Sequence, residues 1–457
     1  MRFLDTLKRE YEKRETVIIP DIKLFSPKDG DLLKGRDPVR IAKDLEAAGA
    51  KAISVVTEEK EFHGSLDLLK AVSANVNIPI LRKDFIESVS DLEQTKAAGA
   101  SAVLLMVSCL GNEKLGYLYR EALMLGLEPF VETHNRNALE FAKRLHAPLV
   151  GINNRDILRL ERDNGDVSLT AGLMKYAPKD AFIVSESSIR DAVDVKKAVK
   201  HGANAVLSGT AILNTADPAA RYLSLKRKAA VKICGIMDRE DIDTCCEENI
   251  DLAGIVCNYP VDVPWNVAPE KASELVACAG KRIRTCLVTG GDLKKVLKLA
   301  ETIKPDLIQL HYTETVKETA ECAKELLDMG INTVRSIPRD KNMRKSMFGT
   351  DDLAEAAKML EDTAVDIVLF DSRDAGNAAG DPGTIVGSPE DETELRAAAA
   401  SLSKLVMIGG GIEGKNAGEI MNVIEPDILD VMSGSEDAPG RKSKEKIRKI
   451  TEAVRRN

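Results

Sequence analysis

Two oppositely charged residues stand where an early apolar run of this 457-residue chain ends. Residues 18–28 read IIPDIKLFSPK, so Asp21 and Lys23 follow a series of aliphatic residues. Residues two apart on a β-strand point to the same face, so we expect Asp21 and Lys23 to share a face and Ile22 to point away. Such a pair is either a solvated ion pair at a strand end or part of a site for proton transfer, and this stretch alone leaves both interpretations open.

The same pattern recurs through the N-terminal half of the chain, where short apolar runs end in polar or glycine residues. These residues are Glu58, Lys83, Glu132, Asn153, Glu186, Ser187, Gly209 and Thr210. Lysines and carboxylates that converge on one place change each other's pKa values through charge proximity and partial burial. Solvated surface charges explain one such residue well, but they explain a whole series at consecutive strand ends poorly. The series therefore favours an active site.

Helical segments separate these apolar runs and indicate how the polar residues are brought together. Residues 37–50 and 91–100 have the period of a helix, and each ends in AAGA, which is typical of a glycine at a helix C-terminus. Continuous apolar strands that alternate with helices predict parallel strands buried on both faces. Eight such units in the first half match a (β/α)8 barrel, in which chemistry takes place at the C-terminal ends of the strands.

The strand–helix count starts again at residue 231, after a junction (residues 217–235) that reads DPAARYLSLKRKAAVKICG. We therefore predict an α/β protein with two tandem (β/α)8 barrels, residues 1–228 and 229–457. A single doubly wound domain is the alternative, but sixteen units would be excessive for one sheet. The short junction indicates that the barrels pack close together, which is compatible with a monomer.

Composition limits the partners that this chain is expected to have. It contains 44% hydrophobic and 30% charged residues with a net charge of -8, which is typical of a globular protein and argues against nucleic acid as the main partner. The first residues, MRFLDTLKREYEKRE, lack the apolar core of a secretory signal, and no apolar run reaches the ~18 residues that cross a membrane. The eight cysteines lack metal-site or disulfide spacing, so we expect a cytoplasmic protein without a metal site.

Six motifs in the first half, DIKLFSPK, SVVTEEKEFHGS, PILRKDFI, EPFVETHN, GINNRDI and VSESSI, together resemble indole-3-glycerol phosphate synthase. The resemblance implies a carboxy-lyase that closes a pyrrole ring with loss of CO2 and water and needs no cofactor. Lys83 would be the general acid, Glu132 would transfer protons during dehydration, and Lys23 would assist chemistry and phosphate binding. Asp21 stands where the family usually has glutamate. The implied substrate-binding residues are Ser26, Asn153, Glu186, Ser187, Gly209 and Thr210.

The second half carries KICGI, IQLH, VLFDS, MIGGGI and DVMSGSE, and it resembles phosphoribosylanthranilate isomerase. The resemblance implies that Cys234 is the general base and Asp371 the general acid of an Amadori rearrangement. A thiol and a carboxylic acid on opposite sides of one pocket can supply its two proton transfers. The implied substrate-binding residues are His311, Gly409, Gly410, Gly411, Ser433 and Gly434.

Besides Asp21, two positions and one stretch depart from these families. Ser188 stands where the synthase usually has glycine, Trp265 stands where the isomerase usually has an arginine for the anthranilate carboxylate, and the stretch after Asp371 is dissimilar. We expect Trp265→Arg to lower KM of the isomerase. The main interpretation is a bifunctional enzyme of tryptophan biosynthesis that acts on small phosphorylated anthranilate–sugar substrates. The alternative is an active synthase whose second barrel is a phosphosugar-binding or stabilising module.

Overall fold

The computed structural model describes residues 2–155, 165–311, 315–371 and 389–455. The chain divides into two compact units, Met1–Lys226 and Arg227–Asn457. Each unit contains a closed barrel of eight parallel strands with helices between them, which confirms the predicted fold class. No helix in the described part of the chain is long and apolar enough to span a bilayer.

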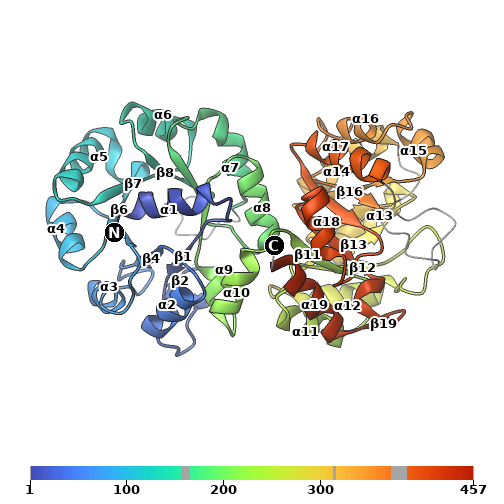
Figure 1. Cartoon of the computed structure of the whole chain (residues 1–457), viewed down its shortest axis with the longest axis horizontal. Helices are drawn as coiled ribbons and strands as arrows, with labels where there is room; N and C mark the ends of the chain where they lie inside the picture. The colour runs from blue at the N-terminus through green and yellow to red at the C-terminus, as the bar shows by residue number, and fades with distance from the viewer. Residues whose placement is uncertain (1, 156–164, 312–314, 372–388, 456–457) are drawn as a thin grey trace. The chain divides into compact units, whose positions relative to one another are not determined.

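The barrel of the first unit closes by pairing of its last strand with its first, and a small hairpin follows the first strand (Figure 1). Its strands are β1 (Ile18–Ile22), β4 (Ile53–Val56), β5 (Ile80–Lys83), β6 (Ala102–Met106), β7 (Glu128–Thr133), β8 (Leu149–Asn153), β9 (Phe182–Glu186) and β10 (Ala205–Ser208), and the hairpin is β2 (Phe25–Ser26) with β3 (Gly30–Asp31). Its surrounding helices are α2 (Pro38–Ala47), α3 (Leu66–Ser73), α4 (Val89–Ala97), α5 (Val107–Met124), α6 (Arg136–Arg144), α7 (Ser168–Leu173), α8 (Ala192–Lys200), α9 (Thr210–Leu213) and α10 (Pro218–Leu225).

Local sequence sets where these helices begin and end. The side chain of Asp37 accepts the N–H of Val39 at the start of α2, and Ser88 forms a reciprocal capping pair with Asp91 at the start of α4. Such caps satisfy N–H groups that have no partner within the helix. Gly49 and Gly99 follow these helices with φ of 99° and 90°, a conformation that glycine adopts without strain. The predicted AAGA helix ends are therefore confirmed.

Side chains along each strand point alternately into and out of this barrel, and those that point inward form layers in its interior. An apolar layer comes from alternate strands, as is usual for this fold: Ile19, Leu81, Phe130 and Val184. The residue two positions later on each of these strands points the same way and stands nearer the C-terminal end of the strand. Those residues are Asp21, Lys83, Glu132 and Glu186, and we call them the charged layer. The barrel thus carries a layer of charges directly above a layer of hydrocarbon.

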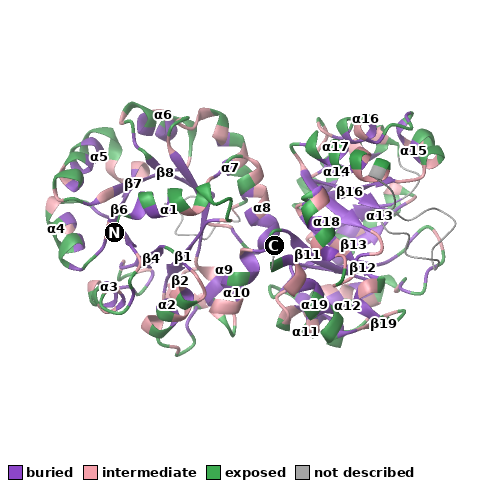
Figure 2. Cartoon of the chain, in the orientation of Figure 1, coloured by how far each residue is buried: buried purple, intermediate pink, exposed green. Residues whose placement is uncertain are grey.

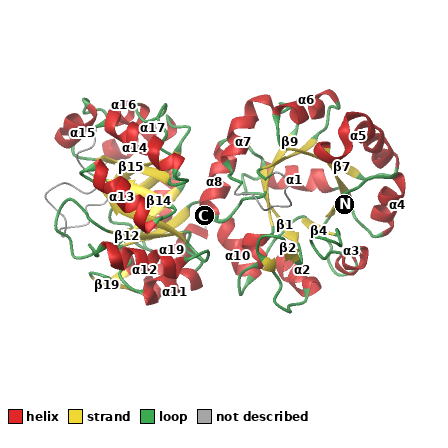
Figure 3. Ribbon diagram, turned by 180° about the vertical axis from the view of Figure 1, so that it is seen from behind, coloured by secondary structure: helices red, strands yellow, loops and turns green. Residues whose placement is uncertain are grey.

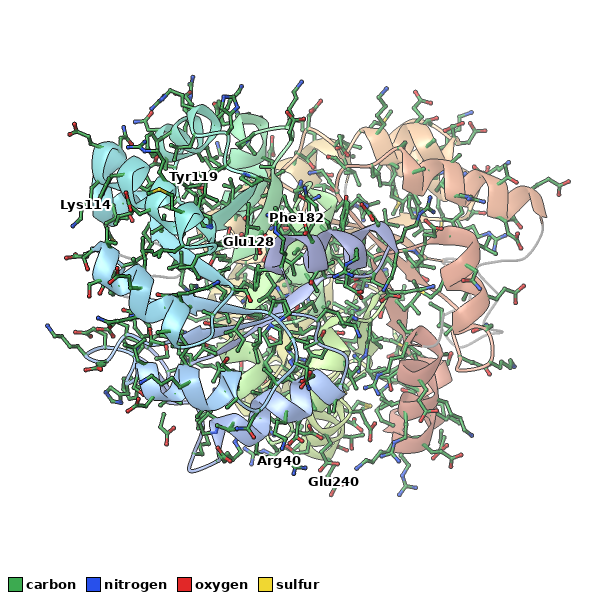
Figure 4. The ribbon with its side chains drawn as sticks, turned by 60° about the vertical axis from the view of Figure 1, so that its left-hand side comes forward. Arg40, Lys114, Tyr119, Glu128, Phe182 and Glu240 are labelled. Carbon is green, nitrogen blue, oxygen red and sulfur yellow. The ribbon has the colours of Figure 1, made fainter. Side chains whose placement is uncertain are left out.

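Helix α1 (Phe3–Glu12) covers the opposite end of the same barrel. Phe3, Leu4 and Leu7 are buried in the interior apolar cluster, and the N–H groups of Phe3 and Leu4 donate to the carboxylate of Glu128, where β7 starts. Figure 1 shows α1 lying across the ring of helices, and Figure 4 shows Glu128 and Phe182 beside it. This N-terminal segment therefore plugs the end of the barrel away from the charged layer and does not form a lid over it.

The second unit repeats the architecture with strands in consecutive order around the barrel (Figure 3). Its strands are β11 (Ala230–Cys234), β12 (Leu252–Val256), β13 (Arg284–Thr289), β14 (Leu307–Leu310), β15 (Asn332–Pro338), β16 (Ile367–Asp371), β17 (Leu405–Gly409) and β18 (Ile428–Val431). Its helices are α11 (Arg239–Glu247), α12 (Pro269–Ala279), α13 (Leu293–Ile303), α14 (Val316–Asp328), α15 (Lys341–Phe348), α16 (Leu353–Lys358), α17 (Pro389–Ala400), α18 (Ala417–Ile424) and α19 (Lys444–Arg455). A hairpin of β19 (Glu436–Ala438) and β20 (Arg441–Lys442) precedes α19.

The main core of the second unit lies between the barrel and its helices. Every second strand residue, such as Val231, Ile233, Ala253 and Ile255, faces this core. In both units, buried residues line the strands and the inner faces of the helices, whereas exposed residues mark the outer helix faces (Figure 2). The remaining strand positions point into the barrel, where the second unit carries several polar side chains.

The plug at α1 leads to a stability prediction. Phe3 is fully buried, so Phe3→Ala should lower the free energy of unfolding of the first unit by about 3–5 kcal/mol, the usual cost for a core phenylalanine. Chemical denaturation measures this change, and Met124→Ala, at a side chain that is 72% exposed, is the matched control with little expected effect. Turnover of the folded variant should be unchanged, because Phe3 lies at the far end of the barrel from the charged layer. A stable Phe3→Ala protein without turnover would contradict this placement of α1.

Candidate active sites

The charged layer of the first barrel contains an ion pair between two predicted site residues. The ammonium of Lys83, at the end of β5, lies 3.0 Å from Oε2 of Glu186, at the end of β9. The Glu186 side chain is fully buried, and Asp21 and Glu132 are buried on two other strands of the same alternate set, β1 and β7. The structure therefore brings together four residues that the sequence places on four different strands.

The pKa values of this layer depend on burial and on the surrounding charges. Burial by itself would lower the pKa of Lys83, but the carboxylates of Glu186, Asp21 and Glu132 outweigh burial and raise it above the ordinary lysine value. Burial raises the pKa of Glu186 to about 8, and the ammonium of Lys83 only partly opposes this effect. Carboxylates grouped so closely do not all ionise together. Near neutral pH, Lys83 is thus a protonated donor.

Residues on the outer face of β5 hold Lys83 in place. The guanidinium of Arg82 donates to Thr57 Oγ1 (2.8 Å), Thr95 Oγ1 (2.9 Å) and Asp84 Oδ2 (2.8 Å). This network fixes the strand end outside the barrel, so that Lys83, between Arg82 and Asp84, points inward. Sequence reasoning missed Arg82, although alternation in the motif LRKDF could have placed it on the outer face.

Glycine at position 151 makes room for Glu186. A Cβ atom on Gly151 of β8 would lie 2.0 Å from Glu186 Oε1 and 2.6 Å from a ring carbon of Phe130. Any larger residue would therefore displace the carboxylate that pairs with Lys83. The position of Glu186 thus depends on a residue that sequence reasoning had not selected.

The loops after β1 and β4 add further predicted residues to the mouth of the barrel. Lys23 is buried, with its ammonium 5.7 Å from the centre of the Phe62 ring, and Ser26 is buried in β2. Glu58 behaves differently, because its carboxylate accepts the N–H groups of Lys60 (3.0 Å), Glu61 (2.8 Å) and Phe62 (3.0 Å). Glu58 therefore shapes its own loop.

The ends of β8 and β9 are tied together by a residue that the sequence analysis did not select. Asn154 donates to Ser185 Oγ (2.9 Å) and to the carbonyl of Glu186 (2.9 Å), and its carbonyl oxygen accepts from Thr170 Oγ1 (2.8 Å). The preceding Asn153, which was predicted, is buried and accepts the N–H of Arg155 (3.0 Å).

The loops after β9 and β10 have unusual backbone geometry. Ser187 and Ser188 have φ of 64° and 59°, which is the left-handed region where glycine is favoured, so both serines are strained. A Cβ on Gly209 would lie 3.0 Å from the carbonyl oxygen of Asp21, so glycine permits close contact between this loop and β1. Thr210 follows as the first residue of α9.

In the second barrel, Cys234 ends β11 and Asp371 ends β16, and both are buried. Strands β17 and β18 separate these two strands on one side of the closed sheet, so the residues stand on opposed parts of the rim. A Cβ on Gly254 would lie 3.0 Å from Cys234 Sγ, and one on Gly409 would lie 3.7 Å from Asp371 Oδ1. Both functional groups therefore face the interior. The dissimilar stretch after Asp371 lies outside the described residues.

A polar network fills the interior of this barrel and reaches His311. The ammonium of Lys232 donates to Gln309 Oε1 (2.8 Å) and Asp430 Oδ2 (2.8 Å), and Gln309 Nε2 lies 2.6 Å from His311 Nε2. The other ring nitrogen of His311 lies 3.3 Å from the hydroxyl of Tyr259. Lys232, Gln309 and Asp430 were missed, although the period-two alternation in KICG and IQLH places the first two on inward positions.

Trp265 lies above Cys234 in a small apolar cluster and is only 7% exposed. Its indole N–H donates to Glu436 Oε1 (2.9 Å), which also accepts from the Lys442 ammonium (2.5 Å). The indole packs so closely on Gly235 that a Cβ there would lie 2.9 Å from Trp265 Cδ1. The loop that carries Trp265 is therefore built around a buried indole–carboxylate contact.

The five predicted residues at the ends of β17 and β18 belong to two strand–loop segments that touch each other. They are Gly409, Gly410, Gly411, Ser433 and Gly434. Gly410 and Gly411 have φ of 111° and 60°, and a Cβ on Gly434 would lie 1.9 Å from the carbonyl oxygen of Ile412. Glycine is thus needed both for the turn and for the contact between the loops.

The described ranges contain no cluster of three or more His, Cys, Asp or Glu side chains able to hold a metal ion. All eight cysteines lie in these ranges, and none of them forms a disulfide.

The two units match two family models. Residues 1–225 match the indole-3-glycerol phosphate synthase model, and residues 231–453 match the N-(5'phosphoribosyl)anthranilate isomerase model. The chain is 45% identical over 213 residues to the indole-3-glycerol phosphate synthase of Thermococcus kodakarensis, covering 46% of this chain and 93% of that protein. It is also 45% identical over 206 residues to the synthase of Pyrococcus furiosus, covering 45% of this chain and 90% of that protein.

Solved isomerase structures resemble the chain over about half of its length. The phosphoribosyl anthranilate isomerase of Thermus thermophilus is 26% identical, with a TM-score of 0.39 and coverage of 49% of this chain and 98% of that one. The isomerase of Pyrococcus furiosus is 20% identical, with a TM-score of 0.38 and coverage of 50% and 98%.

The family matches agree with the architecture of each unit. The first unit shares high identity with synthases over nearly their whole length, and the second matches the isomerase model along almost all of its residues. The chain therefore belongs to the indole-3-glycerol phosphate synthase family and joins to it a phosphoribosylanthranilate isomerase domain, as a bifunctional enzyme of tryptophan biosynthesis.

Proposed function

We propose that the charged layer performs the synthase reaction within residues 1–228. Attack of an aromatic ring carbon on the substrate ketone places negative charge on its oxygen, and Lys83 donates a proton there. Glu132 then transfers protons during loss of water, and Asp21 and Lys23 complete the charged surroundings. The observation that carries this proposal is the 3.0 Å contact that holds the Lys83 ammonium against Glu186. A fixed cation beside a developing alkoxide lowers the barrier without reorganisation at the moment of reaction.

The substrate phosphate is proposed to bind at the loops after the last strands of this barrel. Ser187, Gly209 and Thr210 supply backbone N–H and hydroxyl groups there, which is where barrels of this kind usually bind phosphate. Ser26 and Asn153 extend the pocket toward the remainder of the substrate. The contact between Gly209 and β1 supports this arrangement, because it joins the phosphate loop to the strand that carries Asp21.

Residues 229–457 are proposed to perform the isomerase reaction through Cys234 and Asp371. The sugar would lie between these side chains, with Asp371 protonating the ring oxygen and Cys234 removing the proton for enolisation. Gly409, Gly410, Gly411, Ser433 and Gly434 would bind its phosphate, and His311 would contact the substrate. The match to the isomerase family along residues 231–453 favours this function over a binding or stabilising module.

The substrates are proposed to be phosphorylated anthranilate–sugar conjugates for both sites. Eight cysteines without a disulfide among them support a reducing compartment, and we propose on that ground that the protein is cytoplasmic. We also propose that the chain acts as a monomer, without a nucleic-acid or membrane partner. Size-exclusion chromatography with light scattering measures the molar mass in solution and so tests whether the protein is a monomer.

Removing the general acid tests the role of Lys83. Lys83→Ala should reduce synthase kcat of the folded protein by about 10²-fold or more, the usual scale for a general acid. The measurement is the formation of indole product, and Lys51→Ala, at an exposed lysine, is the control. Near-normal turnover by a well-folded Lys83→Ala protein would rule out this assignment.

A reciprocal pair of variants tests whether the two sites act separately. Glu132→Gln should stop formation of indole-3-glycerol phosphate while the isomerase product accumulates, because the two residue sets lie in different units. Cys234→Ala should do the reverse, blocking consumption of phosphoribosylanthranilate while the synthase still converts supplied intermediate. One assay follows phosphoribosylanthranilate, the isomerase product and indole-3-glycerol phosphate together. Loss of phosphoribosylanthranilate consumption in Glu132→Gln would contradict the model of two sites.

The sequence predicts that Trp265→Arg lowers KM of the isomerase, but the contacts of Trp265 in the structure lead to the opposite prediction. A guanidinium at this position would pair with Glu436, and the indole packing on Gly235 would be lost. We therefore expect Trp265→Arg to raise KM of the isomerase several-fold, with synthase kinetics of the same protein as the internal control. A lower KM would show that the introduced arginine reaches the substrate carboxylate, as the sequence comparison first indicated.

A further inference from the structure

A fully buried lysine lies inside the second barrel, two residues before Cys234 on the same inward face of β11. The ammonium of Lys232 is bound by Asp430 Oδ2 and Gln309 Oε1, each at 2.8 Å, and its side chain is completely inaccessible. Burying an ammonium costs several kcal/mol before its partners compensate, and apolar residues often fill such a position equally well. A charge in this place therefore suggests a function beyond packing.

Lys232 and the Cys234 thiol are close neighbours in space. A Cβ on Gly254 would lie 2.9 Å from Lys232 Cε and 3.0 Å from Cys234 Sγ, so both atoms crowd around one point inside the barrel. The lysine also keeps its charge. Burial would lower the pKa of Lys232, but the carboxylate of Asp430, with smaller contributions from Cys234 and Cys286 in their thiolate form, outweighs burial and raises it. A cation beside a thiol favours the thiolate, which is the form that acts as a base.

We propose that Lys232, held by Asp430 and Gln309, is a positioning residue that keeps Cys234 ionised for proton abstraction. This inference rests on the proposed role of Cys234 as general base. Lys232 does not touch substrate in this arrangement, because Cys234 stands between it and the rim of the barrel.

The charged groups around Cys234 determine whether a substitution favours or opposes ionisation of its thiol. Lys232 and Asp430 lie deeper in the barrel, Cys286 faces them from β13, and Asp371 stands on the opposed part of the rim. Lys442 donates to the backbone carbonyl of Cys234 (2.5 Å), and its charge is matched by Glu436. Lys232 and Asp430 are the two charged residues that lie deeper in the barrel than the thiol. The positive charge of Lys232 favours the thiolate, and the negative charge of Asp430 opposes it. Removing one or the other should therefore move the ionisation of Cys234 in opposite directions.

The same network sets the proton arrangement of His311. Gln309 uses its carbonyl oxygen to accept from Lys232, so its amide N–H is available to His311 Nε2 at 2.6 Å. His311 Nε2 then accepts, and the proton of the neutral ring resides on Nδ1, which faces the Tyr259 hydroxyl at 3.3 Å. The orientation of one buried lysine thus fixes a hydrogen-bond chain that leads to the mouth of the barrel.

The test follows alkylation of Cys234 by iodoacetamide as a function of pH, quantified on its own peptide by mass spectrometry. Lys232→Met should raise the pH midpoint of alkylation by about 1–2 pH units, the scale of one nearby charge in a partly buried site. Asp430→Asn should lower it. Isomerase kcat/KM at pH 7 should fall about tenfold or more in Lys232→Met, and raising the pH should restore part of it.

The double variant Lys232→Met, Asp430→Asn guards against a failure to fold, because removal of both charges from a buried pair is often tolerated. Its midpoint should lie between those of the two single variants, because the two removed charges act on the thiol with opposite signs. An unchanged midpoint in Lys232→Met, or a rise in both single variants, would overturn the proposal, since merely structural damage has no reason to act with opposite signs. Full isomerase activity in Cys234→Ala would instead refute the role of Cys234, whereas the alkylation midpoints would still report on Lys232.

Discussion

Each barrel buries a lysine ammonium against a carboxylate, and the chemistry proposed for both sites depends on this pairing. Lys83 meets Glu186 at 3.0 Å and Lys232 meets Asp430 at 2.8 Å, and in both cases the partners come from different strands. A buried charge without its partner is strongly destabilising, so each pair requires that its barrel be closed and in register. The two lysines differ in how deeply their side chains are buried, and their proposed roles differ accordingly. The Lys83 side chain is 14% exposed and can meet a substrate, whereas that of Lys232 is fully enclosed and acts on the neighbouring Cys234.

The fold and the charged layer could be predicted from sequence because both follow from period-two alternation. Asp21, Lys83, Glu132 and Glu186 each stand two residues after an inward apolar residue, so their common layer follows once the barrel is recognised. Glu58 illustrates the limit of this reasoning. It also follows a strand, but its carboxylate turns back to accept three N–H groups of its own loop.

Residues that act through contacts between strands could not be found in this way. Asn154 joins the ends of β8 and β9, and Gln309 joins Lys232 to His311 across the barrel. Such pairs depend on the register and tilt of strands far apart in the chain, which a local pattern does not contain. Trp265 shows the same limit, because its partner Glu436 is 171 residues away. Aligning the sequence with the isomerase family shows only that the expected arginine is absent at this position. The structure shows that Trp265 makes a different contact, with the carboxylate of Glu436.

The plug formed by α1 has a consequence for the order in which the first barrel is made during translation. The contact between Phe3 and Glu128 joins residues 125 apart in the chain, so α1 leaves the ribosome long before its docking site exists. Pairing of β1 with β10 waits still longer, until Ser208 has been synthesised. Contacts of such long range form slowly, because the chain entropy of a large loop must be lost first. During this interval, the apolar face of α1 with Phe3, Leu4 and Leu7 stays open to water, and it is buried only when the barrel that it plugs has formed.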